Sequence, residues 1–343
     1  MPVTIKTIAE RVGVHHSAVS RALNGKGQQV GLSTKRIDQI RSVADDLGYR
    51  PSATGRAMQR GRTGVIALVV GSLQRHTEYH DALLDGIQDA CEPRDAHLLL
   101  ARLSDQLLDD GARLPKTLRE LSADGLLFKW FPGTSDRLKR VVDEQRLPVI
   151  WLSRKWDYDC VYNDEVEVGR RATQLLIETG HRHIAYFSRI RGGGLDHHFA
   201  ADRESGYRTA MTEAGLTPHV VEPPAEPLVA AALGPCSATV ANLADAAIEV
   251  AMANATAGVG IATHDEAGHA LVAMDNKPVR IGSRSVPTVC PDARGLGAAG
   301  VDMLIRKLAK PNQRLASRAI GCRLTNGAAA APRALSIPPE RRS

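Results

Sequence analysis

The sequence predicts an α/β protein with a three-helix, helix-turn-helix N-terminal head and a larger core of parallel β-sheets. Residues 1–62 contain 11 Lys/Arg and 4 Asp/Glu, whereas the rest of the 343-residue chain contains 33 and 34. A basic head on a near-neutral body indicates a module that binds a polyanion. The alternative is a solvated basic terminus without a partner. Beyond residue 63, short apolar runs alternate with helical patterns, which is typical of parallel sheets covered on both faces.

The head begins with an amphipathic helix over residues 4–12, where apolar residues recur at helical spacing. Thr4 can cap its N-terminus, and Gly13 ends it. A second helix is expected from about Ser17 to Asn24. The apolar positions 8, 12, 14, 19 and 22 match the spacing of a helix-turn-helix motif.

A third helix is expected over residues 33–47. In a helix-turn-helix, the second helix enters the major groove and its first residues meet the edges of the bases. Arg21 follows one turn later, and its guanidinium could pair with guanine through two hydrogen bonds. The residues at the start of that helix are His15, His16 and Ser17. Simple exposure of the two histidines is the alternative interpretation.

The stretch YRPSATGRAMQRGR, residues 49–62, has no acidic residue and separates the head from the body. Pro51 and Gly61 bracket it, and Gly55 weakens a helix by about 1 kcal/mol relative to Ala. Its apolar residues nevertheless sit at helical spacing. The pattern predicts a marginal, positively charged helix, with a plain interdomain linker as the alternative.

The body contains apolar runs that predict buried strands, with a helix from about 78 to 92 after the first of them. Such runs include residues 65–71, 148–153, 182–188, 257–263 and 278–282. The alternation breaks near residues 162–164, where one lobe is expected to end. Ligands of open parallel sheets bind beyond the carboxyl ends of the strands, so residues at strand ends are the candidates for a binding site.

Several classes of protein are disfavoured by the sequence. Its five cysteines are scattered and never form a C-x-x-C pair, which argues against disulfides and zinc. No nucleophile elbow, Ser-His-Asp arrangement or metal cluster can be assembled, so we expect no enzymatic activity and no cofactor. The chain shows no apolar run of 18 residues and no signal-peptide layout at its start. We therefore expect a cytoplasmic protein without a membrane partner.

The head sequences TIKTIAERVGVHHSAVSRALNG and LSTKRIDQIRSVADDLGYRPSATGRAM resemble the lac repressor (LacI/GalR) family of bacterial regulators. Members read roughly T-I-x-D-V-A-x-x-A-G-V-S-x-x-T-V-S-R-x-L-N and, later, L-G-Y-x-P-N-x-x-A-R-x-L. Three departures stand out. Thr7 replaces the usual Asp, so a capping-box partner is expected to be lost, His15 replaces Ser, and Ala18 replaces a phosphate-contacting Thr.

The resemblance implies a DNA-binding domain over residues 1–49 and a hinge over residues 50–62. In the family, two hinges of a dimer fold into helices only on operator DNA, where an apolar side chain wedges open a base step in the minor groove. Met58 falls on the position of that wedge. The residues implied to bind DNA are Thr4, His15, His16, Ser17, Ser20, Arg21, Asn24, Ser52, Gly55, Arg56 and Met58.

The resemblance extends to the body through VYNDEVEVGRRATQLLIETGHRHIAYFS and DRESGYRTAMTEAGL. It implies a periplasmic-binding-protein-like core over residues 63–327, with two lobes and an effector in the cleft between them. We expect the chain to cross near residues 162, 289 and 318. The resulting segments are 63–162 with 290–318, 163–289 with 319–327, and a tail at 328–343 without structure.

Candidate effector residues follow from the same resemblance. Arg203 matches the family's effector-anchoring Arg, and Ser153 sits where sugar binders often have Asp. In RIGSRSVPT, residues 280–288, the family's acidic pair is expected to be replaced by Ser283 and Arg284, which favours an anionic or otherwise unusual effector. The full set is Tyr79, His80, Ser153, Arg203, His264, Asp265 and Arg284. Ordinary polar loop residues are the alternative.

The resemblance therefore implies a homodimeric transcriptional regulator, most readily a repressor, bound to double-stranded operator DNA and gated by a small-molecule effector. It would act in the bacterial cytoplasm, associated with the nucleoid. Two other readings are open: a cytoplasmic solute-binding protein without a DNA role, and a regulator whose effector site is degenerate.

Overall fold

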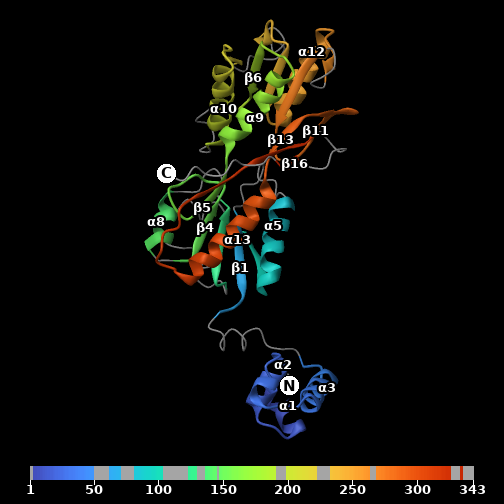
Figure 1. The fold of residues 1–343 in the computed structure, drawn as a ribbon, viewed down its shortest axis with the longest axis vertical. Coiled ribbons are helices and arrows are strands. Elements are labelled where there is room, and N and C mark those ends of the chain that lie inside the picture. The colour runs from blue at the N-terminus through green and yellow to red at the C-terminus, as the bar shows by residue number, and fades with distance from the viewer. Residues whose placement is uncertain are drawn as a thin grey trace. The chain divides into compact units, whose positions relative to one another are not determined.

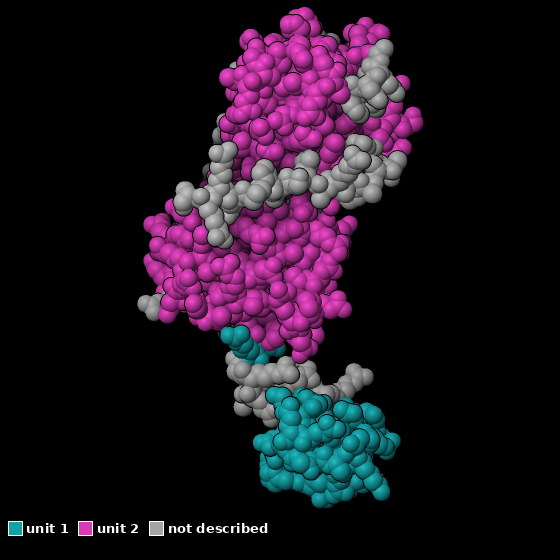
Figure 2. Space-filling model, in the orientation of Figure 1, with its two compact units in different colours: residues 1–63 teal, residues 64–343 magenta. Residues whose placement is uncertain are grey.

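The computed structural model describes residues 3–49, 62–70, 81–102, 123–129, 136–144, 147–190, 198–221, 232–262, 268–325 and 333–334. The chain divides into two compact units, Met1–Thr63 and Gly64–Ser343 (Figure 2). None of the helices in the described ranges combines the length and apolar character that a membrane crossing requires.

The first unit is a three-helix head built around one small apolar core. Its helices are α1 (Ile5–Val12), α2 (His16–Leu23) and α3 (Thr34–Asp46), with the 3₁₀ turn η1 (Gln28–Val30) between the last two. Each helix contributes the apolar face that its spacing predicts. The buried core residues are Ile8, Ala9, Val12, Val19, Ala22, Ile37, Ile40 and Ala44.

The capping of α1 differs from the sequence expectation. Thr7 was expected to remove a capping-box partner, but the box is complete: the Thr7 N–H donates to Thr4 Oγ1 at 3.3 Å and the Thr4 N–H donates to Thr7 Oγ1 at 3.4 Å. The Thr7 hydroxyl reaches the same backbone donor that a carboxylate would. Gly13 then adopts a left-handed φ of 72°, which turns the chain into α2.

Two large sheets form the second unit, beside a two-stranded hairpin, and the first large sheet has the strand order β14-β5-β4-β3-β1-β2. All of its pairings are parallel. Helices α5 (Asp81–Cys91) and α13 (Ala293–Ala309) cover one face, and α8 (Asp136–Glu144) covers the other (Figure 1). The strands are β1 (Val65–Val70), β2 (His97–Arg102), β3 (Gly125–Lys129), β4 (Val149–Leu152), β5 (Cys160–Asn163) and β14 (Arg318–Ile320).

The second sheet has the order β16-β15-β13-β10-β8-β6-β7, with β9 paired to β10. Helices α9 (Glu165–Glu178) and α10 (Phe199–Glu213) pack on one face and α12 (Ala244–Thr256) on the other. Its strands are β6 (Ile184–Ser188), β7 (His219–Val221), β8 (Ala238–Asn242), β9 (Ile261–Ala262), β10 (His269–Met274), β13 (Thr288–Pro291), β15 (Cys322–Thr325) and β16 (Arg333–Ala334).

The chain passes between the two sheets three times. The passages lie between β5 and α9, between β13 and α13, and between β14 and β15. They were expected near residues 162, 289 and 318 and fall at residues 164, 292 and 321. Backbone hydrogen bonds join these segments, from Asp164 N–H to Ile320 O at 2.8 Å and from Asp292 N–H to Gly321 O at 3.1 Å.

Two expected strands differ in extent or place. In the run at residues 257–263, the described residues form the short strand β9, which pairs in parallel with β10. The run at 278–282 forms β11 (Val279–Ile281), but in a separate antiparallel hairpin with β12 (Arg284–Val286). The central strands β8 and β10 were not predicted. The tail was expected to lack structure, but β16 pairs with β15.

Candidate functional site

Close packing of α9 on α10 positions the polar residues at one end of the second sheet. A Cβ on Gly169 would overlap the carbonyl oxygen of Arg203, and one on Gly206 would overlap that of Val166. The two helices therefore approach at backbone distance, which only glycine permits. This approach sets Arg203, on α10, beside Glu165 at the start of α9.

Arg203 is the centre of a buried polar network. It is 2% exposed, and its Nε donates to Glu165 Oε2 at 2.7 Å. Its Nη1 donates to Asn242 Oδ1 at 2.9 Å and to the Met274 carbonyl at 3.1 Å. Asn242 in turn donates to Ser188 Oγ at 3.0 Å. The network thus collects the carboxyl ends of β6, β8 and β10, where ligands of parallel sheets bind.

Asp275 follows β10 directly and is an acidic residue at this edge. Its Oδ2 accepts the Ala244 N–H at 2.7 Å, so it holds the first turn of α12. The family's acidic pair was expected within residues 280–288 and was inferred to be lost, because β10 was not predicted. The apolar run HALVAM, followed by Asp275 and Asn276, was the signal that could have found it.

Arg284 lies instead on the β11–β12 hairpin, where its Nη1 donates to the Ile261 carbonyl at 2.8 Å. That contact joins the hairpin to β9. The expectation of an anionic effector rested on Arg284 replacing an acidic pair, and this reason no longer holds because Asp275 occupies the strand end.

The carboxyl end of the first sheet contributes Ser153 and Lys129. Ser153 is buried and has a φ of 67°, unusual for a residue with a side chain, and its N–H donates to Val161 O at 2.9 Å. Lys129 is half-buried at the end of β3, in register with Leu152. Burial lowers the pKa of Lys129 to about 8, and the neighbouring Glu165 carboxylate opposes this.

Further cations gather around His198, which precedes α10. Burial lowers the pKa of His198, Asp202 raises it, and the charges of Arg154, Lys155 and Lys129 lower it further. The His198 ring also meets the Tyr162 ring of β5 edge-on, with centroids 6.4 Å apart. Residues of both sheets therefore meet at His198.

The head presents a second candidate surface at the start of α2. Thr4, His15, His16, Ser17, Arg21 and Asn24 are exposed, and Ser20 is half-buried. The Ser17 N–H donates to His15 Nδ1 at 3.4 Å. A backbone N–H can only donate, so this contact requires the His15 tautomer with its proton on Nε2. The rings of His15 and His16 lie 4.0 Å apart.

Several predicted site residues lie outside the described residues. These are Ser52, Gly55, Arg56 and Met58 of the expected hinge, and Tyr79, His80, His264 and Asp265 of the expected effector site.

The body matches the family of periplasmic binding proteins and sugar binding domains of the LacI family over residues 63–285. The chain belongs to the LacI family. Its relatives in that family include the maltose regulon regulatory protein MalI of Escherichia coli (strain K12), 30% identical over 63% of this chain and 61% of the relative. The regulator CelR of Thermobifida fusca is 29% identical over 62% of each chain. The matches thus span about three fifths of each relative's length.

Solved structures show the LacI-family fold along nearly the whole chain. The lac repressor dimer bound to operator and the anti-inducer ONPF superposes with a TM-score of 0.70 at 17% identity, over 94% of this chain and 98% of that one. The CelR–cellobiose complex gives a TM-score of 0.59 at 21% identity, with the same coverage of both chains.

Proposed function

We propose that the protein is a sequence-specific DNA-binding transcriptional regulator, acting as a repressor inside the bacterial cell and gated by a small-molecule effector. The observation that carries this proposal is the head. It folds around its own core as a basic helix-turn-helix unit, and the first turn of α2 presents exposed hydrogen-bonding side chains. That is the geometry in which a recognition helix reads the major groove.

The tautomer of His15 supports a direct role in reading DNA. With Nδ1 accepting from Ser17, Nε2–H is left as a donor at the exposed start of α2. Arg21 is exposed one turn later and supplies a second donor group. Donors of this kind can bind the N7 and O6 acceptors of guanine.

The effector is proposed to bind where the two sheets meet, around Arg203. Relatives of this chain are regulators, and CelR, which shares its fold, has been solved in complex with cellobiose. Arg203, Glu165 and Asn242 form a rigid polar floor at the ends of three strands. A ligand that alters how the two sheets meet would change the geometry of the segment that leads to the head, so DNA and effector affinities would be coupled reciprocally.

The protein is further proposed to act as a homodimer, which suits a near-palindromic operator. Apolar side chains are exposed on two elements of the body that a partner copy could cover. They are Leu99 and Leu100 on the edge strand β2, 37% and 51% exposed, and Ile248 and Met252 on α12, 39% and 65% exposed. The lac repressor, which has the same fold, binds its operator as a dimer.

The proposal is tested by fluorescence anisotropy of the full chain on DNA fragments from upstream of its own gene, at several salt concentrations. Arg21→Ala should weaken binding to the preferred fragment by about 5- to 150-fold, because one guanine contact is worth about 1–3 kcal/mol. Binding to unrelated DNA should change little. Sedimentation should show two chains on each specific site.

The matched control is Arg41→Ala, which removes an exposed arginine from α3. It should leave the preference among fragments unchanged. A wild-type protein that binds all fragments with one affinity, as expected of a solute carrier, would overturn the proposal.

A further inference from the structure

The ammonium group of Lys129 lies at the carboxyl end of the first sheet, and no described residue forms an ion pair with it. Lys129 is the last residue of β3, in register with Leu152 on β4, and it is half-buried. Within the described parts of the chain, its Nζ makes no hydrogen bond and no ion pair. A charge that is partly withdrawn from water and has no partner among the described residues is costly, so its presence calls for a reason.

Glu165 does not supply the missing partner, because Arg203 already holds it. The Arg203–Glu165 ion pair measures 2.7 Å, and both side chains are nearly inaccessible, at 2% and 6%. Lys129 is close enough for the charge of Glu165 to affect its pKa but does not pair with it. Lys129 and Arg203 therefore act on the same carboxylate, and among the described residues Arg203 is the one that pairs with it.

Arg203 also has unused hydrogen-bonding capacity. Its hydrogen bonds are donated by Nε and Nη1, and Nη2 donates none to any described residue. The guanidinium is fixed on one side by Glu165 and Asn242. Its remaining N–H groups and the Lys129 ammonium are thus hydrogen-bond donors at the same junction. Among the described residues, no acceptor binds them.

We propose that Lys129 binds an oxyanion, a carboxylate or a phosphate group carried by the effector, together with the free edge of Arg203. This rests on the proposed function of the junction as the effector site and names the chemical class of its ligand. An oxyanion compensates positive charge and also accepts hydrogen bonds from both donors. A neutral hydroxyl can accept a hydrogen bond but compensates no charge. Arg154, Lys155 and Lys129 all lower the pKa of His198, whereas the carboxylate of Asp202 opposes them, so further positive charge lies close to this part of the junction.

The lowered pKa of Lys129 agrees with this assignment. Burial holds it at about 8, so the amine loses its proton in mildly alkaline solution while unliganded. A bound oxyanion would favour the charged form, and binding above pH 8 should therefore take up a proton. Calorimetry in buffers of different ionisation enthalpy measures that uptake.

The test uses the full chain and probes that come in matched pairs of similar size. Gluconate is compared with sorbitol, and glucose 6-phosphate with glucose, at constant ionic strength, by thermal shift and calorimetry. At least one anionic member should raise the midpoint of unfolding, while its neutral counterpart should raise it far less. The carboxylate and phosphate arms show which oxyanion the site accepts.

Lys129→Met keeps the stem of the side chain and removes the charge. It should weaken binding of the stabilising anion at least about tenfold without changing the response to neutral probes. Lys310→Met, an exposed lysine after α13, is the matched control and should bind like the wild type.

The inference is overturned if no anion in the panel gives a Lys129-dependent shift, or if neutral probes bind as well as their anionic counterparts. Failure of the proposed function is a separate result, because it would appear as a lack of sequence preference on DNA in the wild-type protein.

Discussion

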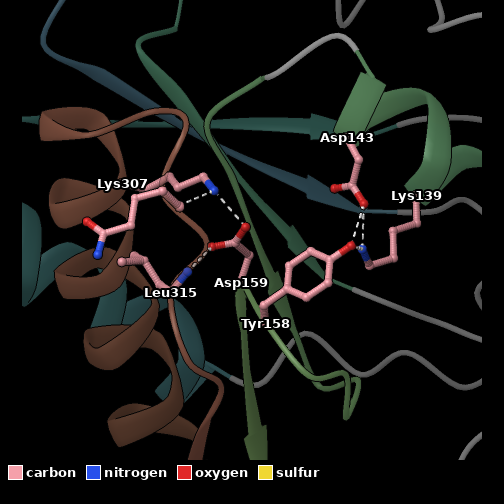
Figure 3. A network of polar contacts seen from close by, with 7 residues as sticks. Lys139, Asp143, Tyr158, Asp159, Lys307 and Leu315 are labelled. Atoms are coloured by element: carbon pink, nitrogen blue, oxygen red, sulfur yellow. Dashed lines mark hydrogen bonds and ion pairs between the residues drawn. The ribbon is translucent and has the colours of Figure 1, made fainter.

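Two lysines of the body illustrate opposite uses of a charge withdrawn from water. Lys307 lies on α13, which packs on one face of the first sheet, and it is 6% exposed. Its Nζ contacts Asp159 Oδ2 at 2.6 Å and the Gln313 carbonyl at 2.7 Å (Figure 3). Lys129, at the end of β3, has no such partner among the described residues. The first charge is satisfied within the fold, whereas the second has no counter-ion among the described residues, and we propose that the effector supplies one.

The satisfied lysine fastens a connection. Asp159 Oδ1 accepts the Leu315 N–H at 3.0 Å, and the Asp159 N–H donates to Leu315 O at 2.8 Å, so one aspartate binds both α13 and the segment that leads to β14 (Figure 3). Beside it, Lys139 contacts Asp143 at 2.7 Å and Tyr158 at 3.1 Å. The difference between the two regions teaches that burial alone does not distinguish a structural charge from a ligand-binding one. The presence of a counter-ion does.

The largest expected effect comes from breaking the satisfied pair. Asp159→Asn keeps the size of the side chain and tolerates the φ of 54° at this position, but it leaves Lys307 buried without a counter-charge. We expect a loss of about 3–5 kcal/mol in the free energy of unfolding, measured by urea denaturation. The combined Asp159→Asn, Lys307→Met variant should recover most of that loss, because no lone charge remains. Equal stability of the single and combined variants would show that the ion pair is not what fastens this connection.

A buried basic group whose partner is neutral should have an effect on stability that is intermediate between those of the two lysines. His269, at the start of β10, is 6% exposed, and its Nε2 lies 2.8 Å from Thr239 Oγ1. Burial lowers its pKa to about 4, helped by the charge of His181. The unfolded chain therefore binds the proton more tightly, and stability should fall as the pH drops from about 6.5 to 4, by about 3 kcal/mol in total.

The measurement is chemical denaturation between about pH 4 and 7, the range that spans both pKa values. His269→Gln cannot take up this proton, so its stability should depend less on pH over that range. The exposed His183 supplies the matched control, and His183→Gln should behave like the wild type. An identical slope for wild type and His269→Gln would contradict the role of His269.

The sequence predicted the elements whose patterns are local. The head follows from apolar spacing within short segments, and Gly13 and Thr4 mark the ends of its first helix. Strands β8 and β10 were missed because ATVAN is rich in alanine and HALVAM follows a polar segment, so neither shows the alternation or aromatic content typical of strands. Missing β10 also misplaced the acidic residue of the site, which shows how one strand error moves a functional assignment.

The charge balance of the site could not be read from the sequence. Arg203 was predicted as a ligand-binding residue, but its pairing with Glu165, 38 residues away, depends on the glycine contacts that bring α9 and α10 together. Lys129 appears in the sequence only as one polar residue after an apolar run. Whether a counter-ion lies beside it depends on residues from other elements of the fold, and among the described residues none pairs with it.

The smallest effect has the opposite sign and separates the two lysines most directly. Lys129→Met removes a half-buried charge that has no partner among the described residues, so without ligand it should leave stability unchanged or raise it by about 1 kcal/mol at pH 7. The lowered pKa of Lys129 likewise indicates that its charged form destabilises the folded protein. Wild-type stability should rise from about pH 8 to 10, because the folded protein has then shed a proton that the unfolded chain still binds. Lys307→Met, by contrast, leaves the buried carboxylate of Asp159 without its counter-ion and should destabilise the protein. If both substitutions destabilise it alike, Lys129 has a counter-ion in solution, and the contrast between a structural and a ligand-binding lysine does not hold.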